Sequence, residues 1–244
     1  MTYCLAISTV HGFVLASDSR TNAGVDQIST TTKMHRFVKP GERVFALLTA
    51  GSLSVTQSVI TLLQRQFDNG GCLASAPTMY DAARCVGEQI RTVDALDRAA
   101  LEKDNIAFNV SVLLAGQIGS QPHEIYMIYP QGNPLRSTED SPFLQIGEVK
   151  YGRPILDRGI RYHDTSLEEA AKYALISLDS TMRSNVSVGP PIDILAYHKD
   201  SLNFTHHRRF NERDPALAQV RTFWEQSLRK AVADLPPITL SPRA

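Results

Sequence analysis

The sequence predicts an α+β protein built as a four-layer α-β-β-α sandwich. Two early runs, residues 4–7 and 13–16, are apolar at successive positions, which is typical of strands covered on both faces. The expected elements run as strands, two helices, strands, two helices and strands, so strands and helices form segregated layers rather than alternating units. Two sheets packed face to face, each covered by a pair of helices, satisfy both observations.

The N-terminal half is expected to contain a strand hairpin, two further strands and two helices. Apolar runs at 2–10 and 13–18 flank His11-Gly12, a pair that favours a tight turn. Residues 21–32 are polar and rich in Thr, so we expect a loop or an irregular strand there. The next elements are strands at 33–38 and 43–50 and, from the helical spacing of apolar residues, helices at 52–69 and 78–103.

The C-terminal half continues with strands, helices and a final amphipathic helix. The expected strands lie at 108–115, 124–129, 143–146, 192–197 and 201–206, and the expected helices at 154–160, 167–182 and about 215–235. Ser166 is the expected N-cap of the helix at 167–182, because Glu168 and Glu169 follow in its first turn. No repeat or long linker interrupts the chain, so we expect residues 1–244 to form a single domain that ends in the C-terminal helix.

Composition excludes several classes of function. Of the 244 residues, 43% are apolar, and 25 Lys and Arg balance 25 Asp and Glu, so there is no basic field for nucleic acid. The apolar runs are too short to span a membrane, and no signal peptide precedes the first strand, so we expect a cytoplasmic protein. The three cysteines, Cys4, Cys72 and Cys85, lack metal-ligand spacing and are expected to be free thiols. We expect no metal and no cofactor.

Thr2 stands directly before the first predicted strand. Methionine aminopeptidase should accept so small a second residue, and we expect the mature chain to begin at Thr2. The residue would then carry a hydroxyl and a free α-amine, a nucleophile with its own base. An α-amine has an ordinary pKa of about 7.7–8, so it can accept a proton near neutral pH. The alternative is that Thr2 is an ordinary second residue.

Three further residues are expected close to Thr2. Asp18 ends the second strand of the hairpin, so its carboxylate should lie beside Thr2, and Lys33 at the start of the next strand should pair with Asp18. The N–H of Gly51, at a strand–helix junction, could donate to a developing oxyanion. The alternatives are a turn role for Asp18, a solvated Lys33 with Lys39 as its competitor, and a backbone role for Gly51.

These positions carry a family resemblance. Thr2, Asp18, Lys33 and Ala50-Gly51 resemble the β-subunits of proteasomes and HslV-type proteases, which are N-terminal-nucleophile hydrolases. The Met-Thr start, Ser17-Asp18-Ser19-Arg20, the segment 182–189 and the long C-terminal helix resemble one branch, the bacterial proteasome-like proteins called Anbu. The resemblance covers nearly the whole chain and implies the same four-layer sandwich.

The resemblance also implies roles for individual residues. Thr2 would be the nucleophile, Asp18 and Lys33 would orient and activate it, and Gly51 would supply an oxyanion-hole N–H. Ser187 matches a serine of the family pattern, whereas Ser184 occupies the position of the family's second aspartate. The alternative for both serines is a helix-end cap or turn. The segment 147–150 replaces a serine-containing segment near the amine, where Glu148 could supply the missing hydrogen bonds.

The function expected from these features is that of a threonine-type hydrolase of peptide or other amide bonds. As in its relatives, the subunit would join a self-compartmentalising homo-oligomer, either a ring or a helical washer, with Thr2 facing an internal cavity. The helices at 52–69, 78–103 and 215–235 are the expected contacts. The alternatives are a catalytically weak or silent ring protein that serves ligand binding or assembly, and an amidase for one special amide. An unidentified ATP-dependent partner is possible, although the sequence has no evident motif for docking one; no nucleic-acid or membrane partner is expected.

Overall fold

The computed structural model describes residues 2–23 and 27–238 of the chain. Its strands are β1 (Tyr3–Thr9), β2 (Gly12–Asp18), β3 (Arg20–Ala23), β4 (Gln27–Thr30), β5 (Met34–Lys39), β6 (Arg43–Gly51), β7 (Val110–Ile118), β8 (Glu124–Ile128), β9 (Pro134–Arg136), β10 (Phe143–Gly147), β11 (Ile192–His198) and β12 (His206–Phe210). Its helices are α1 (Leu53–Asp68), the short 3-10 helix η1 (Cys72–Ala74), α2 (Met79–Lys103), α3 (Arg153–Gly159), α4 (Leu167–Ser184) and α5 (Pro215–Ala233).

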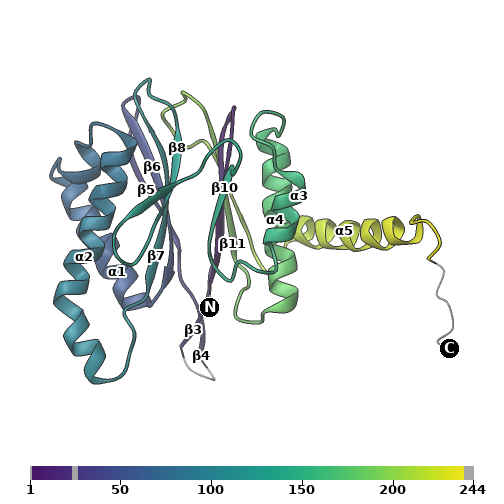
Figure 1. Ribbon diagram of the computed structural model, residues 1–244, viewed down its shortest axis with the longest axis horizontal. Helices are drawn as coiled ribbons and strands as arrows, with labels where there is room; N and C mark the ends of the chain where they lie inside the picture. The colour runs from purple at the N-terminus through teal and green to yellow at the C-terminus, as the bar shows by residue number, and fades with distance from the viewer. Residues whose placement is uncertain (1, 24–26, 239–244) are drawn as a thin grey trace.

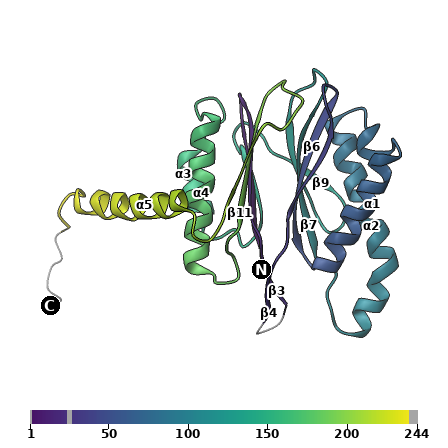
Figure 2. The same ribbon diagram turned by 180° about the vertical axis from the view of Figure 1, so that it is seen from behind.

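Two antiparallel sheets pack face to face, and helices cover the outer face of each (Figure 1). The first sheet has the strand order β10-β1-β2-β11-β12 and is covered by α3 and α4. The second sheet has the order β5-β6-β7-β8-β9 and is covered by α1 and α2, as the view from behind also shows (Figure 2). The predicted α-β-β-α sandwich is therefore confirmed.

Strand β1 shows why apolar residues occupy successive positions. All seven of its residues are buried. Tyr3, Leu5 and Ile7 pack in the cluster beneath α4, whereas Cys4 and Ala6 pack between the two sheets. A strand with two covered faces needs an apolar side chain on each, and burying one large aliphatic side chain contributes about 1.5–3 kcal/mol.

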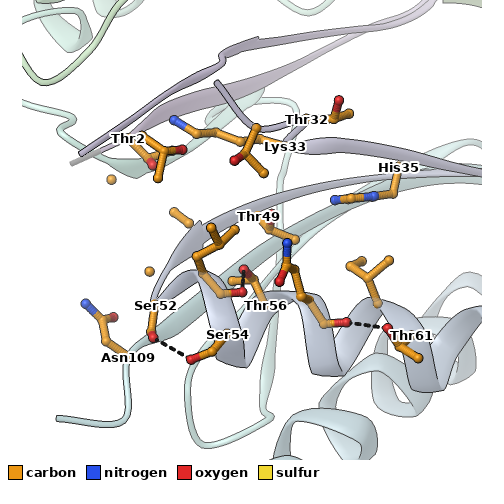
Figure 3. Close-up of a pocket in the computed structure, with 18 of the residues that line it drawn as sticks. Thr2, Thr32, Lys33, His35, Thr49, Ser52, Ser54, Thr56, Thr61 and Asn109 are labelled. Atoms are coloured by element: carbon orange, nitrogen blue, oxygen red, sulfur yellow. Dashed lines mark hydrogen bonds between the residues drawn. The ribbon is translucent and has the colours of Figure 1, made fainter. Parts of the chain in front are cut away.

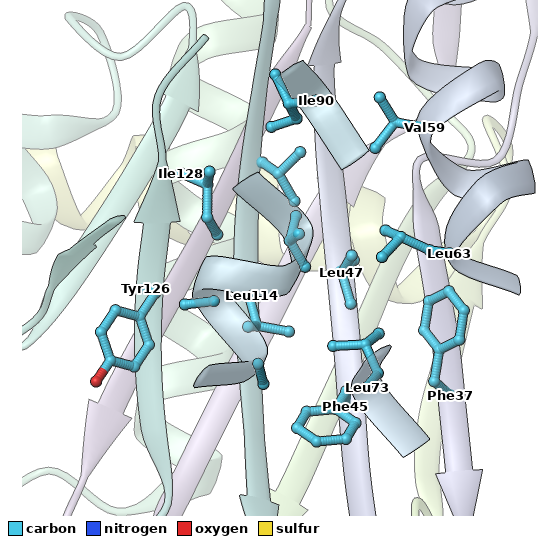
Figure 4. Packing of buried hydrophobic residues seen from close by; sticks show 14 of the residues in the cluster. Phe37, Phe45, Leu47, Val59, Leu63, Leu73, Ile90, Leu114, Tyr126 and Ile128 are labelled. Carbon is cyan, nitrogen blue, oxygen red and sulfur yellow. The ribbon is translucent and has the colours of Figure 1, made fainter. Parts of the chain in front are cut away.

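A separate apolar core joins the second sheet to its helices (Figure 4). Phe45 and Leu47 of β6 point toward Val59 and Leu63 of α1 and Ile90 of α2. These side chains lie on the helix faces that the 3.6-residue period predicts. The four layers thus enclose three cores, one between the sheets and one beneath each helical layer.

Two local predictions differ from the structure. The strand expected at 201–206 is observed later, as β12, because residues 200–202 turn the chain, with positive φ at Asp200 and Leu202. Cys72 and Cys85 form a disulfide, so the prediction of three free thiols was wrong for this pair and holds for buried Cys4. η1 and α2 bring the two Cα atoms to 5.7 Å, within the range that a disulfide bridges, a proximity that spacing alone did not indicate.

Helix α5 projects away from the sandwich (Figure 1). Leu217 near its start is buried against the α4 layer, and Arg221 Nε lies 2.6 Å from Asp179 Oδ1 on α4. Beyond this anchor, Phe223, Leu228 and Val232 are 72%, 52% and 60% exposed. Among the described residues, no helix is long and apolar enough to cross a membrane.

Candidate functional site

A cleft of about 1230 Å³ opens at one end of the sandwich (Figure 3). It lies where β1, β5 and β6 reach the first turns of α1, so it collects residues from the start of the chain and from the sheet–helix junction. Nine of the twenty described residues that line it carry a small hydroxyl side chain: Thr2, Thr21, Thr31, Thr32, Thr49, Thr56, Thr61, Ser52 and Ser54. Thr2, Lys33 and Gly51, predicted from separate segments, all line this one cleft.

A buried ion pair lies beside Thr2. Lys33 Nζ is 2.7 Å from Asp18 Oδ1 and donates a second hydrogen bond to the Arg20 carbonyl oxygen at 2.8 Å. This confirms the predicted salt-bridge distance between Lys33 and Asp18. Figure 3 shows the Lys33 side chain extending toward Thr2, so its ammonium presents a fixed positive charge at that end of the cleft. The alternative of a solvated Lys33 is excluded, because its side chain is only 7% exposed.

The Asp18 carboxylate accepts three hydrogen bonds. Its Oδ1 accepts from the Tyr3 N–H at 3.1 Å as well as from Lys33, and its Oδ2 accepts from the Gly189 N–H at 3.2 Å. Burial raises the pKa of Asp18, and the Lys33 charge and the hydrogen-bond donors act in the opposite direction. Three donors aimed at one carboxyl group favour its ionised form, which in turn holds the Lys33 ammonium in place.

The backbone of Thr2 is anchored by Glu148. Its carbonyl oxygen accepts a hydrogen bond from the Glu148 N–H at 2.8 Å. Gly147, with φ of +85°, lets the backbones approach, because a Cβ at this position would lie 1.9 Å from the Thr2 carbonyl oxygen. The Thr2 carbonyl is therefore anchored next to the end of β10.

Gly51 directs a backbone N–H into the cleft. The Ser52 N–H donates to the Asn109 carbonyl at 2.8 Å, so it points toward β7. Successive N–H groups of a strand point to opposite sides, so the N–H of the preceding residue, Gly51, points away from β7. The Thr49 N–H, which points the same way as that of Gly51, donates to the Lys33 carbonyl on the neighbouring segment. Gly51 lies two residues further on and lines the cleft, where its N–H is available to a ligand.

The turn after α4 contacts the site through Asn185 and Gly189, whereas the sequence suggested Ser184 and Ser187. Ser184 is exposed at the end of α4, Ser187 is half-buried in the turn, and neither is among the residues that line the cleft. Their neighbours reach the site instead: Asn185 Nδ2 donates to Glu148 Oε2 at 3.0 Å, and the Gly189 N–H binds Asp18. The sequence signal for Glu148 was its place in the segment 147–150; nothing in the sequence singled out Asn185.

His35 is the remaining titratable group that lines the cleft. It points into the cleft from β5, two residues beyond Lys33 (Figure 3), and burial lowers its pKa. Over residues 2–23 and 27–238, no group of three or more His, Cys, Asp or Glu side chains is arranged to hold a metal ion. The described residues that line the cleft supply hydroxyl groups, the Lys33 ammonium, the His35 imidazole and the Glu148 carboxyl group.

Comparison with known proteins identifies the family. An Anbu mutant from Hyphomicrobium sp. strain MC1 superposes with a TM-score of 0.92 and 41% identity, covering 98% of this chain and 100% of that one. Anbu from Yersinia bercovieri gives 0.91 and 44% over the same shares. This chain belongs to the Anbu family. A structure described as a helical assembly of the Anbu complex from Pseudomonas aeruginosa gives 0.92 and 46%, covering 98% of each chain.

The Anbu assignment agrees with a more distant sequence relationship. A proteasome subunit beta from Haloquadratum walsbyi is 26% identical over 211 residues, which is 86% of this chain and 79% of that protein. No protein-family model matches the chain. The Anbu and proteasome relationships together explain why the predicted fold and the predicted grouping of Thr2, Lys33 and Gly51 agree with the structure.

Proposed function

We propose that this chain is an N-terminal threonine hydrolase of amide bonds and works as a subunit of a self-compartmentalising homo-oligomer. The observation that carries the proposal is the buried Lys33–Asp18 pair beside Thr2 in an open cleft. Burying a lysine ammonium is unfavourable. A buried ammonium next to a hydroxyl group provides a fixed positive charge, which stabilises negative charge that develops on the hydroxyl oxygen during a reaction.

The first step is attack of the Thr2 hydroxyl on a substrate carbonyl carbon. As the new C–O bond forms, the hydroxyl proton passes to the Thr2 α-amine. The electron pair of the carbonyl moves to its oxygen, which the Gly51 N–H stabilises, and the Lys33 charge opposes build-up of positive charge on the amine. The protonated amine then gives its proton to the leaving nitrogen as the C–N bond breaks, which leaves an ester on Thr2.

The second step returns the site to its starting state. A water molecule attacks the ester carbonyl, and the α-amine takes one of its protons. The C–O bond to Thr2 breaks, the threonine oxygen recovers a proton, and the acid product leaves. An oxyanion-hole donor such as the Gly51 N–H contributes about 10²–10³-fold to kcat in enzymes of this kind. The mechanism requires a chain that begins at Thr2, because a retained Met1 would convert the amine into an amide.

A threonine-directed electrophile, such as a peptide β-lactone, tests this proposal. We expect intact-mass measurement to show one adduct per chain on protein that begins at Thr2, and peptide mapping to place it on Thr2. Thr2→Ala should abolish the adduct and leave the fold intact. Thr32→Ala is the matched control, since Thr32 lines the same cleft, and it should keep the adduct. A native chain that retains Met1, or labelling that survives Thr2→Ala, would contradict the mechanism.

The oligomer is proposed from the surface of α5. Phe223, Leu228 and Val232 are more than half exposed on a helix that projects from the body. They lie on different sides of α5, so contacts around the projecting helix would bury them, and exposed large apolar surface marks an interface. Tyr80 and Leu96 on α2 are also 52% and 72% exposed. A second copy of this chain fits, because a solved Anbu relative is described as a helical assembly. An open helix and a closed ring differ only in the rise per subunit.

Light scattering at micromolar concentration tests the assembly. We expect a mass many times the 27.0 kDa of the chain. Phe223→Ser combined with Leu228→Ser should reduce that mass, whereas Gln226→Ser, an exposed polar change on the same helix, should not. A stable monomer of the unsubstituted chain would refute both the assembly and the enclosed cleft.

Two further functions remain distinguishable from general proteolysis. The described residues that line the cleft combine hydroxyl groups with apolar side chains such as Leu53 and Ile60, a lining that fits a substrate with both polar and apolar parts. An amidase for one special amide would react with the electrophile and fail on peptide libraries. A silent ring protein would assemble and show no adduct on Thr2.

A further inference from the structure

We propose that Glu148 is a positioning residue for the Thr2 α-amine: its carboxylate, held by Asn185, faces the amine and stabilises the proton that the amine receives. The inference rests on the proposed function and adds a group that orients the base.

The strand register places Glu148 opposite Thr2. Strand β1 pairs with β10 so that Cys4 faces Ile146 and Tyr3 faces Gly147, and the next pair outward is Thr2 with Glu148. The Glu148 N–H to Thr2 carbonyl bond of 2.8 Å continues this register. Gly147, with φ of +85°, ends β10 and lets the Glu148 backbone approach Thr2.

Thr2 and Glu148 both line the cleft. One backbone hydrogen bond joins them directly, so the Glu148 side chain begins beside Thr2 and is long enough for its carboxylate to reach the Thr2 nitrogen. The other carboxylate at the site, Asp18, already accepts from Tyr3, Lys33 and Gly189.

The Glu148 carboxylate is held by Asn185 and lies near Lys150. Asn185 Nδ2 donates to its Oε2 at 3.0 Å, and Lys150 Nζ lies 3.5 Å from its Oε1. Asn185 is itself fixed, because its N–H donates to the Thr181 carbonyl at 2.9 Å and its Oδ1 accepts from the Ser187 N–H at 3.0 Å. The Glu148 side chain is only 13% exposed, so the carboxylate has a defined direction and further accepting capacity.

The charges around Thr2 give this arrangement a chemical use. Lys33 disfavours a proton on the amine by repulsion between like charges, and Glu148 favours it. When Thr2 attacks, the amine becomes an ammonium, and the carboxylate facing it stabilises that ion. An acid that orients a histidine base does the same in serine hydrolases. Glu148, held by Asn185, thus orients the amine at the place where the related proteasome subunits have a serine-containing segment.

Titration of the Thr2 amine tests the inference without using turnover. On protein shown by intact mass to begin at Thr2, the rate of N-terminal acylation by acetic anhydride is measured against pH and read on the N-terminal peptide, since only the neutral amine reacts. We expect Glu148→Gln to lower the midpoint by about one pH unit, which raises the acylation rate near pH 6 up to about tenfold. Glu148→Asp, which keeps the charge, should give a midpoint closer to that of the unsubstituted protein.

Glu168→Gln is the matched control, because Glu168 carries the same charge at the far end of α4 and pairs with Lys172 at 2.7 Å. It should leave the midpoint unchanged. A Glu148→Gln midpoint equal to that of the unsubstituted protein would overturn the inference, whether or not the protein hydrolyses amides. A shifted midpoint in a protein whose Thr2 forms no adduct with the electrophile would support the inference and refute the proposed hydrolase function.

Discussion

Neutralising Asp18 should destabilise the protein far more than neutralising an exposed carboxylate would. Asp18→Asn keeps the size of the side chain but removes the negative charge next to Lys33 Nζ, 2.7 Å away. Lys33 would keep the Arg20 carbonyl as an acceptor, but its charge would stay buried with no counter-ion. The new amide would also place either its NH₂ group or its weaker neutral oxygen against the Gly189 N–H. Breaking a buried ion pair on one side costs about 3–5 kcal/mol, and we expect Asp18→Asn to fall in this range.

The double variant separates this effect from loss of packing. Lys33→Met removes the buried charge and keeps an apolar chain of similar length, so Asp18→Asn with Lys33→Met leaves no unpaired ion. We expect the double variant to be less destabilised than the sum of the two single variants by about 2–3 kcal/mol. It should also lose electrophile labelling, since the field at Thr2 is gone.

Urea unfolding followed by far-UV circular dichroism measures these values. Circular dichroism is preferred because the only tryptophan, Trp224, lies on α5, outside the sandwich. The protomer concentration is held constant, because assembly adds to apparent stability. Additivity of the two single variants within about 0.5 kcal/mol, the range found for independent sites, would refute the claim that Asp18 and Lys33 stabilise each other.

Two further predictions concern the cleft. Gly51→Ala should lower the free energy of unfolding by at least about 1–3 kcal/mol and reduce labelling of Thr2. The reason is that φ of Gly51 is +122° and the new Cβ would lie 2.2 Å from the Asn109 carbonyl oxygen. Gly70→Ala, with φ of +77° and open space around it, should destabilise the protein less. Burial lowers the pKa of His35, so the unfolded chain takes up a proton first and stability falls as pH drops below about 6.5. In urea titrations at several pH values, His35→Gln should flatten that fall by at most about 1.4 kcal/mol per pH unit; an unchanged slope would exclude His35 as a source.

The sequence predicted the parts of the site that depend on short-range pattern. The hairpin around His11-Gly12 brings Asp18 next to the start of β1, and a strand that begins near Lys33 completes the ion pair; both follow from strand and turn signals close in sequence. The helices and the layer order followed from periodicity for the same reason. Residue types and spacing therefore sufficed to place Asp18 and Lys33 together beside Thr2.

The supporting contacts could not be predicted in this way. Gly189 binds Asp18 through a backbone N–H, and a backbone donor does not depend on which residue type stands at that position. Asn185 reaches Glu148 across 37 positions in the chain, a pairing that depends on how α4 ends over β10. The roles suggested for Ser184 and Ser187 stay predictions; the contacts that this turn makes to Glu148 and Asp18 come from Asn185 and Gly189.

The strand order of the first sheet has a consequence for folding. The second sheet and its helices come from one continuous stretch, residues 34–136, so this half can form once that stretch has been synthesised. Strand β1 pairs instead with β10 on one side and with β2 on the other, and β2 pairs with β11. Strand β1 therefore lacks one neighbour until β10 at Phe143–Gly147 has been made, and the sheet is complete only with β12 at His206–Phe210. Contacts this distant in sequence form slowly, so the half of the cleft that holds Thr2 should be completed later than the half that holds Gly51.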